Sequence, residues 1–257
     1  MCGIVGYIGE KDATPIILNG LKKLEYRGYD SAGLAVIENG SIALRRDAGK
    51  LEKLITLVNQ KPVSGNLGIG HTRWATHGVP SANNAHPHIS GNGKVVLVHN
   101  GIVENFLELK QELMAENVQF QSDTDSETIV LLVERFLSSG KDLVDSARST
   151  FELLRGAHGI VLISSDEPDK IVAARIGNAG GVVIGLGDDE AFIASDIPAI
   201  LEHTRRMIFL ESHQYAVVTR KWVKVYDFNG NEVEYQVHTV AWDPVAAEKG
   251  EYRHFMQ

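Results

Sequence analysis

Residues 1–8 (MCGIVGYI) open the chain with its only cysteine directly behind the initiator methionine. Removal of Met1 would leave Cys2 with both a thiol and a free α-amine. The thiol is the strongest common nucleophile of proteins, and an α-amine with a pKa of about 7.7–8.0 can act as its base. The apolar run 3–8 predicts a first strand that would hold this terminus in place. The alternative is that Cys2 is simply a small buried residue of that strand.

Length and composition describe one large domain or two small ones with a substantial core. The chain has 257 residues, of which 44% are hydrophobic and 23% charged. The net charge of −8 argues against a nucleic-acid or anionic-membrane surface. A single cysteine cannot form an internal disulfide, and no apolar run reaches the ~20 residues that a membrane span requires. We therefore expect a cytoplasmic protein.

Strand signals occupy both ends of the sequence. Predicted hairpins pair 33–38 with 41–46 around Asn39-Gly40, and 222–228 with 232–237 around Asn229-Gly230. Asn-Gly between two β-prone runs favours a type I′ turn, in which both central residues have positive φ. The uninterrupted apolar runs 95–98 and 160–163 indicate strands that are buried on both faces.

Helical periodicity is concentrated between the strand-rich regions, with one further helix near the start. Thr14-Pro15 begins a segment with an apolar face, and Thr124 with Glu127 predicts a capping box before another helix. Helices are also predicted over 103–116 and 142–154. The stripe expected for the first of these is Val103, Phe106, Leu107, Leu113 and Met114. This order of elements favours layered α+β architecture with antiparallel sheets over a doubly wound fold.

Two loop segments combine charged, aromatic and glycine residues. The segment 26–33 (YRGYDSAG) is either a functional loop or a turn held by an Arg27–Asp30 contact. In 70–78 (GHTRWATHG), Arg73 could bind a carboxylate through two hydrogen bonds. The alternative for this second segment is a solvent-exposed Arg73 beside a partly buried Trp74.

Polar residues at two predicted element ends offer further chemistry. Asn100 and Gly101 follow a buried strand and could form an oxyanion hole from a side-chain amide and a backbone N–H, or a simple turn. Asp125 precedes a helix, where it either binds a ligand ammonium group or complements the helix dipole. Five histidines between 71 and 99 leave a metal site conceivable. They lack HExxH or CxxC spacing, so we predict no metal.

Together these segments resemble the class II (N-terminal nucleophile) glutamine amidotransferases, and more narrowly the glutaminase halves of the glucosamine-6-phosphate synthase family. The resemblance is carried by residues 1–9 (MCGIVGYIG), 24–33 (LEYRGYDSAG), 70–78 (GHTRWATHG), 84–88 (NAHPH), 98–105 (VHNGIVEN), 122–127 (SDTDSE) and 252–257 (YRHFMQ). It implies a four-layer αββα sandwich of two antiparallel sheets.

The resemblance also implies roles for single residues. Cys2 would be the nucleophile, Asn100 and Gly101 the oxyanion hole, and Arg73 and Asp125 the partners of the α-carboxylate and α-amine of L-glutamine. Thr76 and His77 would lie on a loop that closes over glutamine. Trp74 would help to gate the passage of ammonia to the partner domain, and Arg27 would support the region around the nucleophile.

By the same resemblance, residues 2–240 would be a glutaminase domain, without cofactor or metal. Residues 241–257 would be a linker or the start of an absent sugar-phosphate isomerase half. A full-length protein would be a homodimer that transfers the ammonia to fructose 6-phosphate. Two alternatives remain open: the glutaminase domain of another class II amidotransferase, and a non-catalytic glutamine-sensing domain.

Overall fold

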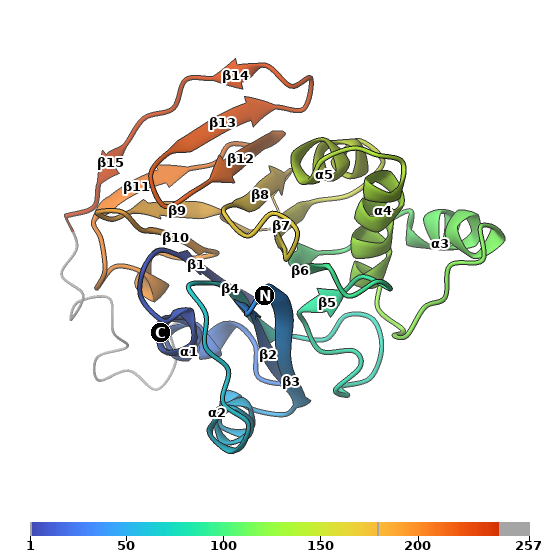
Figure 1. Ribbon diagram of the computed structural model, residues 1–257, viewed down its shortest axis with the longest axis horizontal. Coiled ribbons are helices and arrows are strands. Elements are labelled where there is room, and N and C mark those ends of the chain that lie inside the picture. Colours follow the sequence, from blue (N-terminus) through green and yellow to red (C-terminus); the bar gives the residue numbers. More distant parts are fainter. Residues whose placement is uncertain (1, 179, 242–257) are drawn as a thin grey trace.

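A computed structural model describes residues 2–178 and 180–241, which form two antiparallel sheets stacked face to face and covered by helices on both outer faces (Figure 1). The first sheet contains, in spatial order, β15 (His238–Thr239), β11 (Arg206–Phe209), β9 (Val183–Leu186), β10 (Ala191–Ala194), β1 (Gly3–Ile8), β4 (Leu67–Arg73), β2 (Ser31–Glu38) and β3 (Ser41–Ala48). The second contains β14 (Glu232–Val233), β13 (Val223–Asp227), β12 (Gln214–Val218), β8 (Ile171–Ile176), β7 (His158–Ser164), β6 (Val95–Gly101) and β5 (His88–Ile89).

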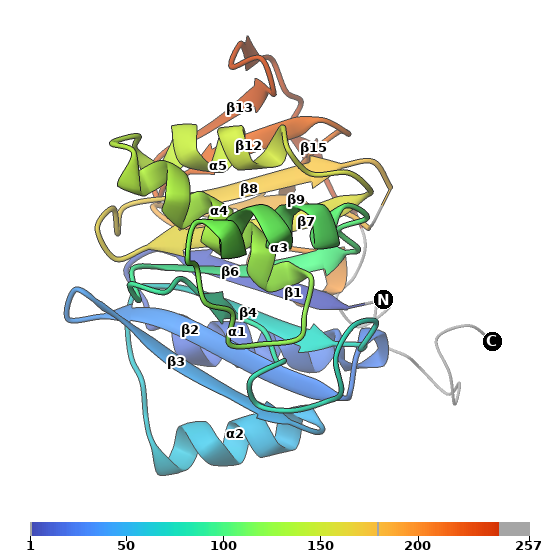
Figure 2. The ribbon, with the colours of Figure 1, turned by 90° about the vertical axis from the view of Figure 1, so that its right-hand side faces the viewer.

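The helices form the two outer layers (Figure 2). Helices α1 (Ala13–Lys23) and α2 (Leu51–Gln60) pack on the first sheet, with the short 3-10 turns η1 (Glu25–Arg27) and η2 (Ile197–Ala199) nearby. Helices α4 (Ser126–Ser138) and α5 (Leu143–Phe151) cover the second sheet, and α3 (Phe106–Ala115) packs beside α4. The predicted four-layer αββα sandwich is confirmed. No helix within the described residues is long and apolar enough to cross a membrane.

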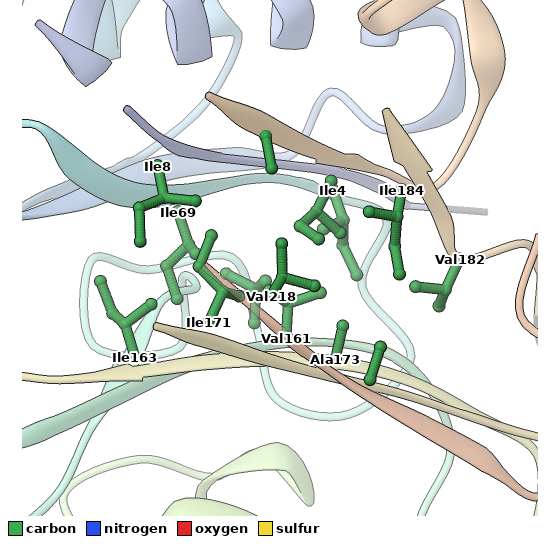
Figure 3. Packing of buried hydrophobic residues seen from close by; sticks show 14 of the residues in the cluster. Ile4, Ile8, Ile69, Val161, Ile163, Ile171, Ala173, Val182, Ile184 and Val218 are labelled. Carbon is green, nitrogen blue, oxygen red and sulfur yellow. The ribbon is translucent and has the colours of Figure 1, made fainter. Parts of the chain in front are cut away.

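Several strands show no alternation of polar and apolar residues, because both of their faces are buried. In β1, Ile4 and Ile8 point into the space between the sheets and belong to one cluster with Val161 of β7 (Figure 3), whereas Val5 and Tyr7 pack toward the helices. The run 95–98 divides in the same way, because successive strand side chains point to opposite faces. The prediction of doubly buried strands is therefore confirmed.

The two predicted hairpins differ in their turns. Asn39 and Gly40 both have positive φ, 51° and 76°, as a type I′ turn requires. In the second hairpin only Gly230 has positive φ, and Asp227 accepts its backbone N–H at 3.0 Å. The expected type I′ turn at Asn229-Gly230 is wrong, because three residues separate Asp227 from Asn231 and a single left-handed glycine closes this longer loop.

Two details of the predicted helices are also wrong. In α3 the side chains of Leu109 and Leu113 are buried, whereas Leu107 and Met114 are 63% and 57% exposed, because the helix rests on α4 along a narrower stripe than expected. Thr124 and Glu127 form no capping box. The Glu127 carboxylate instead accepts the backbone N–H groups of the preceding loop residues Gln121 and Ser122. Helix α2, for which we made no prediction, spans LEKLITLVNQ.

Strand register gathers the site residues at one end of the sandwich. Gly3 of β1 lies opposite Thr72 of β4, so antiparallel pairing places Cys2 beside Arg73. Ser31 of β2 lies opposite Arg73, which brings Asp30 to the same end. The predicted linker at 241–257 falls, apart from residue 241, outside the described residues.

Candidate active site

A cavity of about 470 Å³ opens at this end of the sandwich, between the two sheets and the start of α4. Its lining includes seven of the predicted site residues, namely Cys2, Arg73, Trp74, Thr76, Asn100, Gly101 and Asp125. They come from the residue before β1, from β4 and β6, from the loop after β4 and from the residue before α4. Residues far apart in sequence thus share one concave surface, the usual setting of a small-molecule site.

Cys2 sits half-buried at the start of β1. Its Sγ accepts the backbone N–H of Trp74 at 3.2 Å and lies 3.6 Å from the Trp74 carbonyl oxygen. Burial raises the pKa of the Cys2 thiol, and the Trp74 hydrogen bond and the Arg73 charge oppose that rise. The thiol therefore needs a base to remove its proton before it can attack as thiolate.

Asn100 and Gly101 end β6 immediately beside Cys2. The Asn100 Nδ2 donates to the Cys2 carbonyl oxygen at 3.1 Å, and Asn100 Oδ1 lies 3.1 Å from the His71 ring. Gly101 has a φ of +136°, and a Cβ there would lie 2.1 Å from the Ala157 carbonyl oxygen. These two residues are the end of a strand, so the alternative of a simple Asn-Gly turn is wrong.

Arg73 is buried at the end of β4, with only 4% of its surface exposed, whereas the neighbouring Trp74 is 50% exposed. This is the reverse of the exposed-arginine alternative. The Arg73 Nη2 donates to the backbone carbonyls of His77 and Gly78, which wraps the loop after β4 around the guanidinium. Its Nη1 is buried and, among the described residues, has no hydrogen-bond partner. A buried guanidinium with a spare donor suits an anionic ligand group.

Asp125 precedes α4 and is also buried. Its Oδ2 accepts the Val103 backbone N–H at 2.7 Å, and its Oδ1 lies 4.0 Å from His77 Nδ1. Its side chain makes no capping hydrogen bond, although its place at the N-terminus of α4 is also favourable for the helix dipole. Thr76 lines the cavity, whereas His77 is outside the lining and reaches it only through Thr76 and Asp125.

Arg27 lies outside the cavity in η1. It pairs with Asp196 at 2.8 Å and donates to the Ser195 carbonyl oxygen, and the Ser195 hydroxyl accepts the Ile4 backbone N–H at 2.9 Å. Arg27 thus braces the segment that holds β1. The alternative of an Arg27–Asp30 turn contact is wrong, because Arg27 pairs with Asp196 and Asp30 accepts the Ala75 backbone N–H.

A buried histidine group lies beside the cavity, with His86 and His99 in its lining, and none of it belongs to the site predicted from the sequence. It consists of His71, His86, His88, His99 and His158. Burial lowers the pKa of all five, that of His71 to about 4, so the rings are neutral near pH 7. His71, His86, His88 and His99 stand out in the sequence by their close spacing, which we interpret above only in terms of metal binding, whereas no sequence signal points to His158. Within the described residues, no group of three His, Cys, Asp or Glu side chains could hold a metal ion.

Known proteins resemble this chain in sequence. The glutamine amidotransferase domain family model matches residues 59–227. The chain is 47% identical over 256 residues to a glutamine–fructose-6-phosphate aminotransferase [isomerizing] of Caldanaerobacter subterraneus subsp. tengcongensis, and 48% identical over 261 residues to the protein of that name in Chlorobaculum tepidum. All of this chain aligns, but it spans only 41% and 42% of those two relatives.

The fold is similar to a solved structure as well. The glutamine phosphoribosylpyrophosphate amidotransferase from B. subtilis, complexed with ADP and GMP, superposes with a TM-score of 0.77 at 25% identity. That match covers 90% of this chain and 50% of the other. The family model alone covers more than half of the sequence. The chain therefore belongs to the glutamine amidotransferase domain family.

Proposed function

We propose that this chain hydrolyses L-glutamine to glutamate and ammonia through a γ-glutamyl thioester on Cys2. The observation that carries the proposal is that Cys2, Asn100, Gly101, Arg73 and Asp125 line the same cavity. It combines a nucleophile, candidate oxyanion donors and two opposite charges. No cofactor is needed for this reaction.

The two charges suit the backbone end of glutamine. Free glutamine is a zwitterion, so Arg73 Nη1 would bind the α-carboxylate and Asp125 Oδ1 the α-ammonium group. Both side chains are buried, which strengthens charge-assisted hydrogen bonds relative to water. Simple amides carry neither charge and would bind less well.

The chemistry then proceeds in two halves. The Cys2 sulfur forms a bond to the side-chain carbonyl carbon, and the negative charge on oxygen is stabilised by Asn100 Nδ2–H and the Gly101 backbone N–H. The Cys2 α-amine, freed by removal of Met1, takes the thiol proton and returns it to the amide nitrogen, which leaves as ammonia. Water then cleaves the thioester, which gives glutamate and the free thiol.

The neighbouring residues would complete the site. The loop holding Thr76 and His77 wraps Arg73 and would close over glutamine. Trp74, half exposed beside the Cys2 thiol, would gate the departure of ammonia. Arg27 would keep β1 and its nucleophile in place through Ser195 and Asp196.

The relatives are longer than this chain, which bears on the whole protein. We propose that residues 2–240 are the glutaminase domain and that 241–257 lead into an isomerase half, as the 41% coverage of the relative suggests. The full protein would be a cytoplasmic homodimer that uses the ammonia to convert fructose 6-phosphate into glucosamine 6-phosphate. The name shared by the relatives supports this acceptor.

The test is intact mass together with glutamate release, before and after treatment with 6-diazo-5-oxo-norleucine. We expect a mass without Met1, hydrolysis of glutamine, and one adduct at Cys2 that abolishes activity. Cys2→Ser serves as the matched control, which should take up no adduct. A protein that lacks Met1 but neither hydrolyses glutamine nor forms the adduct would favour the glutamine-sensing alternative.

A further inference from the structure

The Asn100 side chain, which belongs to β6 of the second sheet, is held by two groups of the first sheet. Its Nδ2 donates to the Cys2 carbonyl oxygen on the first sheet at 3.1 Å, and its Oδ1 lies 3.1 Å from Nε2 of His71, on β4 of the same sheet. His71 continues the inward-facing row that contains Ile69, and Asn100 continues the row that contains Val98. The two side chains thus lie at the cavity end of the layer between the sheets, next to Arg73 of the same row of β4.

The surroundings of His71 determine which ring nitrogen carries its proton. Nε2 also lies 3.1 Å from the His99 carbonyl oxygen, and a carbonyl oxygen can only accept a hydrogen bond. Nε2 must therefore be the N–H donor, shared between the His99 carbonyl oxygen and Asn100 Oδ1. The ring is completely buried, and its Nδ1 has no partner in the described part of the chain, which agrees with a neutral ring unprotonated at Nδ1.

We propose that His71 is a positioning residue whose Nε2–H holds the Asn100 amide with its NH₂ group toward the Cys2 reaction centre. The inference rests on the proposed glutaminase function. If the amide turned over, its NH₂ would face the Nε2–H donor, and its oxygen would face both the Cys2 carbonyl oxygen and the oxyanion of the reaction. Since the backbone of His99 fixes the ring tautomer, the amide has only one orientation that satisfies both neighbours.

The same contact would also strengthen the oxyanion donor. The His71 N–H that binds Asn100 Oδ1 polarises the Asn100 amide. This polarisation makes the N–H groups of Asn100 Nδ2 better hydrogen-bond donors. His71 does not line the cavity, so its effect on the reaction passes through Asn100 rather than through glutamine. Loss of the His71 donor should therefore slow the chemical step and leave glutamine binding nearly unchanged.

Three variants of His71 separate this role from simple packing. His71→Gln keeps an amide N–H donor at the reach of Nε2, whereas the shorter His71→Asn places its amide at the reach of Nδ1, and His71→Leu has no donor. We expect kcat for glutamine hydrolysis to fall about 10- to 100-fold in His71→Leu and His71→Asn, with KM within about threefold of the parent. His71→Gln should recover most of that loss.

The decisive comparison is a double-mutant cycle with Asn100→Ala. If His71 acts through Asn100, His71→Leu should lower kcat less than about threefold once Asn100 is alanine. If the two substitutions lower kcat independently, so that their fold-losses multiply in the double mutant, the proposal is overturned. If His71→Leu fails to fold, equal kcat values for His71→Gln and His71→Asn would overturn it as well. An inactive parent protein would instead refute the glutaminase function itself, and Cys2 alkylation by iodoacetamide reports separately on an intact nucleophile.

Discussion

The neutral buried histidines predict that this fold loses stability in mild acid. The pKa of His71 is about 4 in the native state because the ring is buried, against about 6.5 in an unfolded chain. Below pH 6.5 the unfolded chain therefore binds a proton that the native protein does not. The resulting stability is complete above pH 6.5 and is lost progressively as the pH falls toward 4.

The size of the effect follows from these two values. Between pH 7.5 and pH 5 the linkage relation gives a loss of about 2 kcal/mol in unfolding free energy from His71 alone. The lowered pKa values of His86, His88, His99 and His158 add losses of the same sign. Most carboxylates remain ionised above pH 5, so this window isolates the histidines.

Urea unfolding at several pH values, followed by tryptophan fluorescence, measures the loss. We expect the unfolding free energy to fall by at least about 2 kcal/mol from pH 7.5 to pH 5. In His71→Gln, which cannot titrate there, the fall should be smaller by about that amount. An unfolding free energy that stays constant over this range, or an equal fall in both proteins, would refute the reasoning.

Three further predictions concern single side chains. Asn100→Ala should lower kcat by about 10²- to 10³-fold with little change in KM, and unchanged turnover would remove Asn100 from the mechanism. Arg73→Gln should lower kcat/KM for glutamine by at least about tenfold. It should lower kcat/KM for 4-aminobutanamide less, because that amide lacks the α-carboxylate. Equal losses of kcat/KM on both substrates would argue against carboxylate binding by Arg73. Leu113→Ala should cost about 2–5 kcal/mol of unfolding free energy, because the side chain is fully buried, whereas Leu107→Ala should stay within about 0.5 kcal/mol; similar costs for the pair would contradict the observed face of α3.

Much of the architecture could be predicted from local sequence. Asn39-Gly40 specifies its turn by backbone conformation alone, and the runs 95–98 and 160–163 reveal double burial because no polar residue interrupts them. The errors arose where tertiary contacts overrode local pattern. Glu127 bonds the preceding loop instead of capping α4, and α4 determines which leucines of α3 are buried.

The sequence by itself determined the residues that we propose for the site: Cys2 with its thiol and prospective base, the Asn100-Gly101 pair, and the opposite charges Arg73 and Asp125. These assignments depend on residue type and motif, which are local properties. Only the tertiary structure decided that Arg73 is buried with a spare donor, that Arg27 pairs with Asp196, and that His71 holds Asn100. The physical reason is that burial and hydrogen-bond partners depend on strand register and sheet stacking, which bring together residues that lie far apart along the chain.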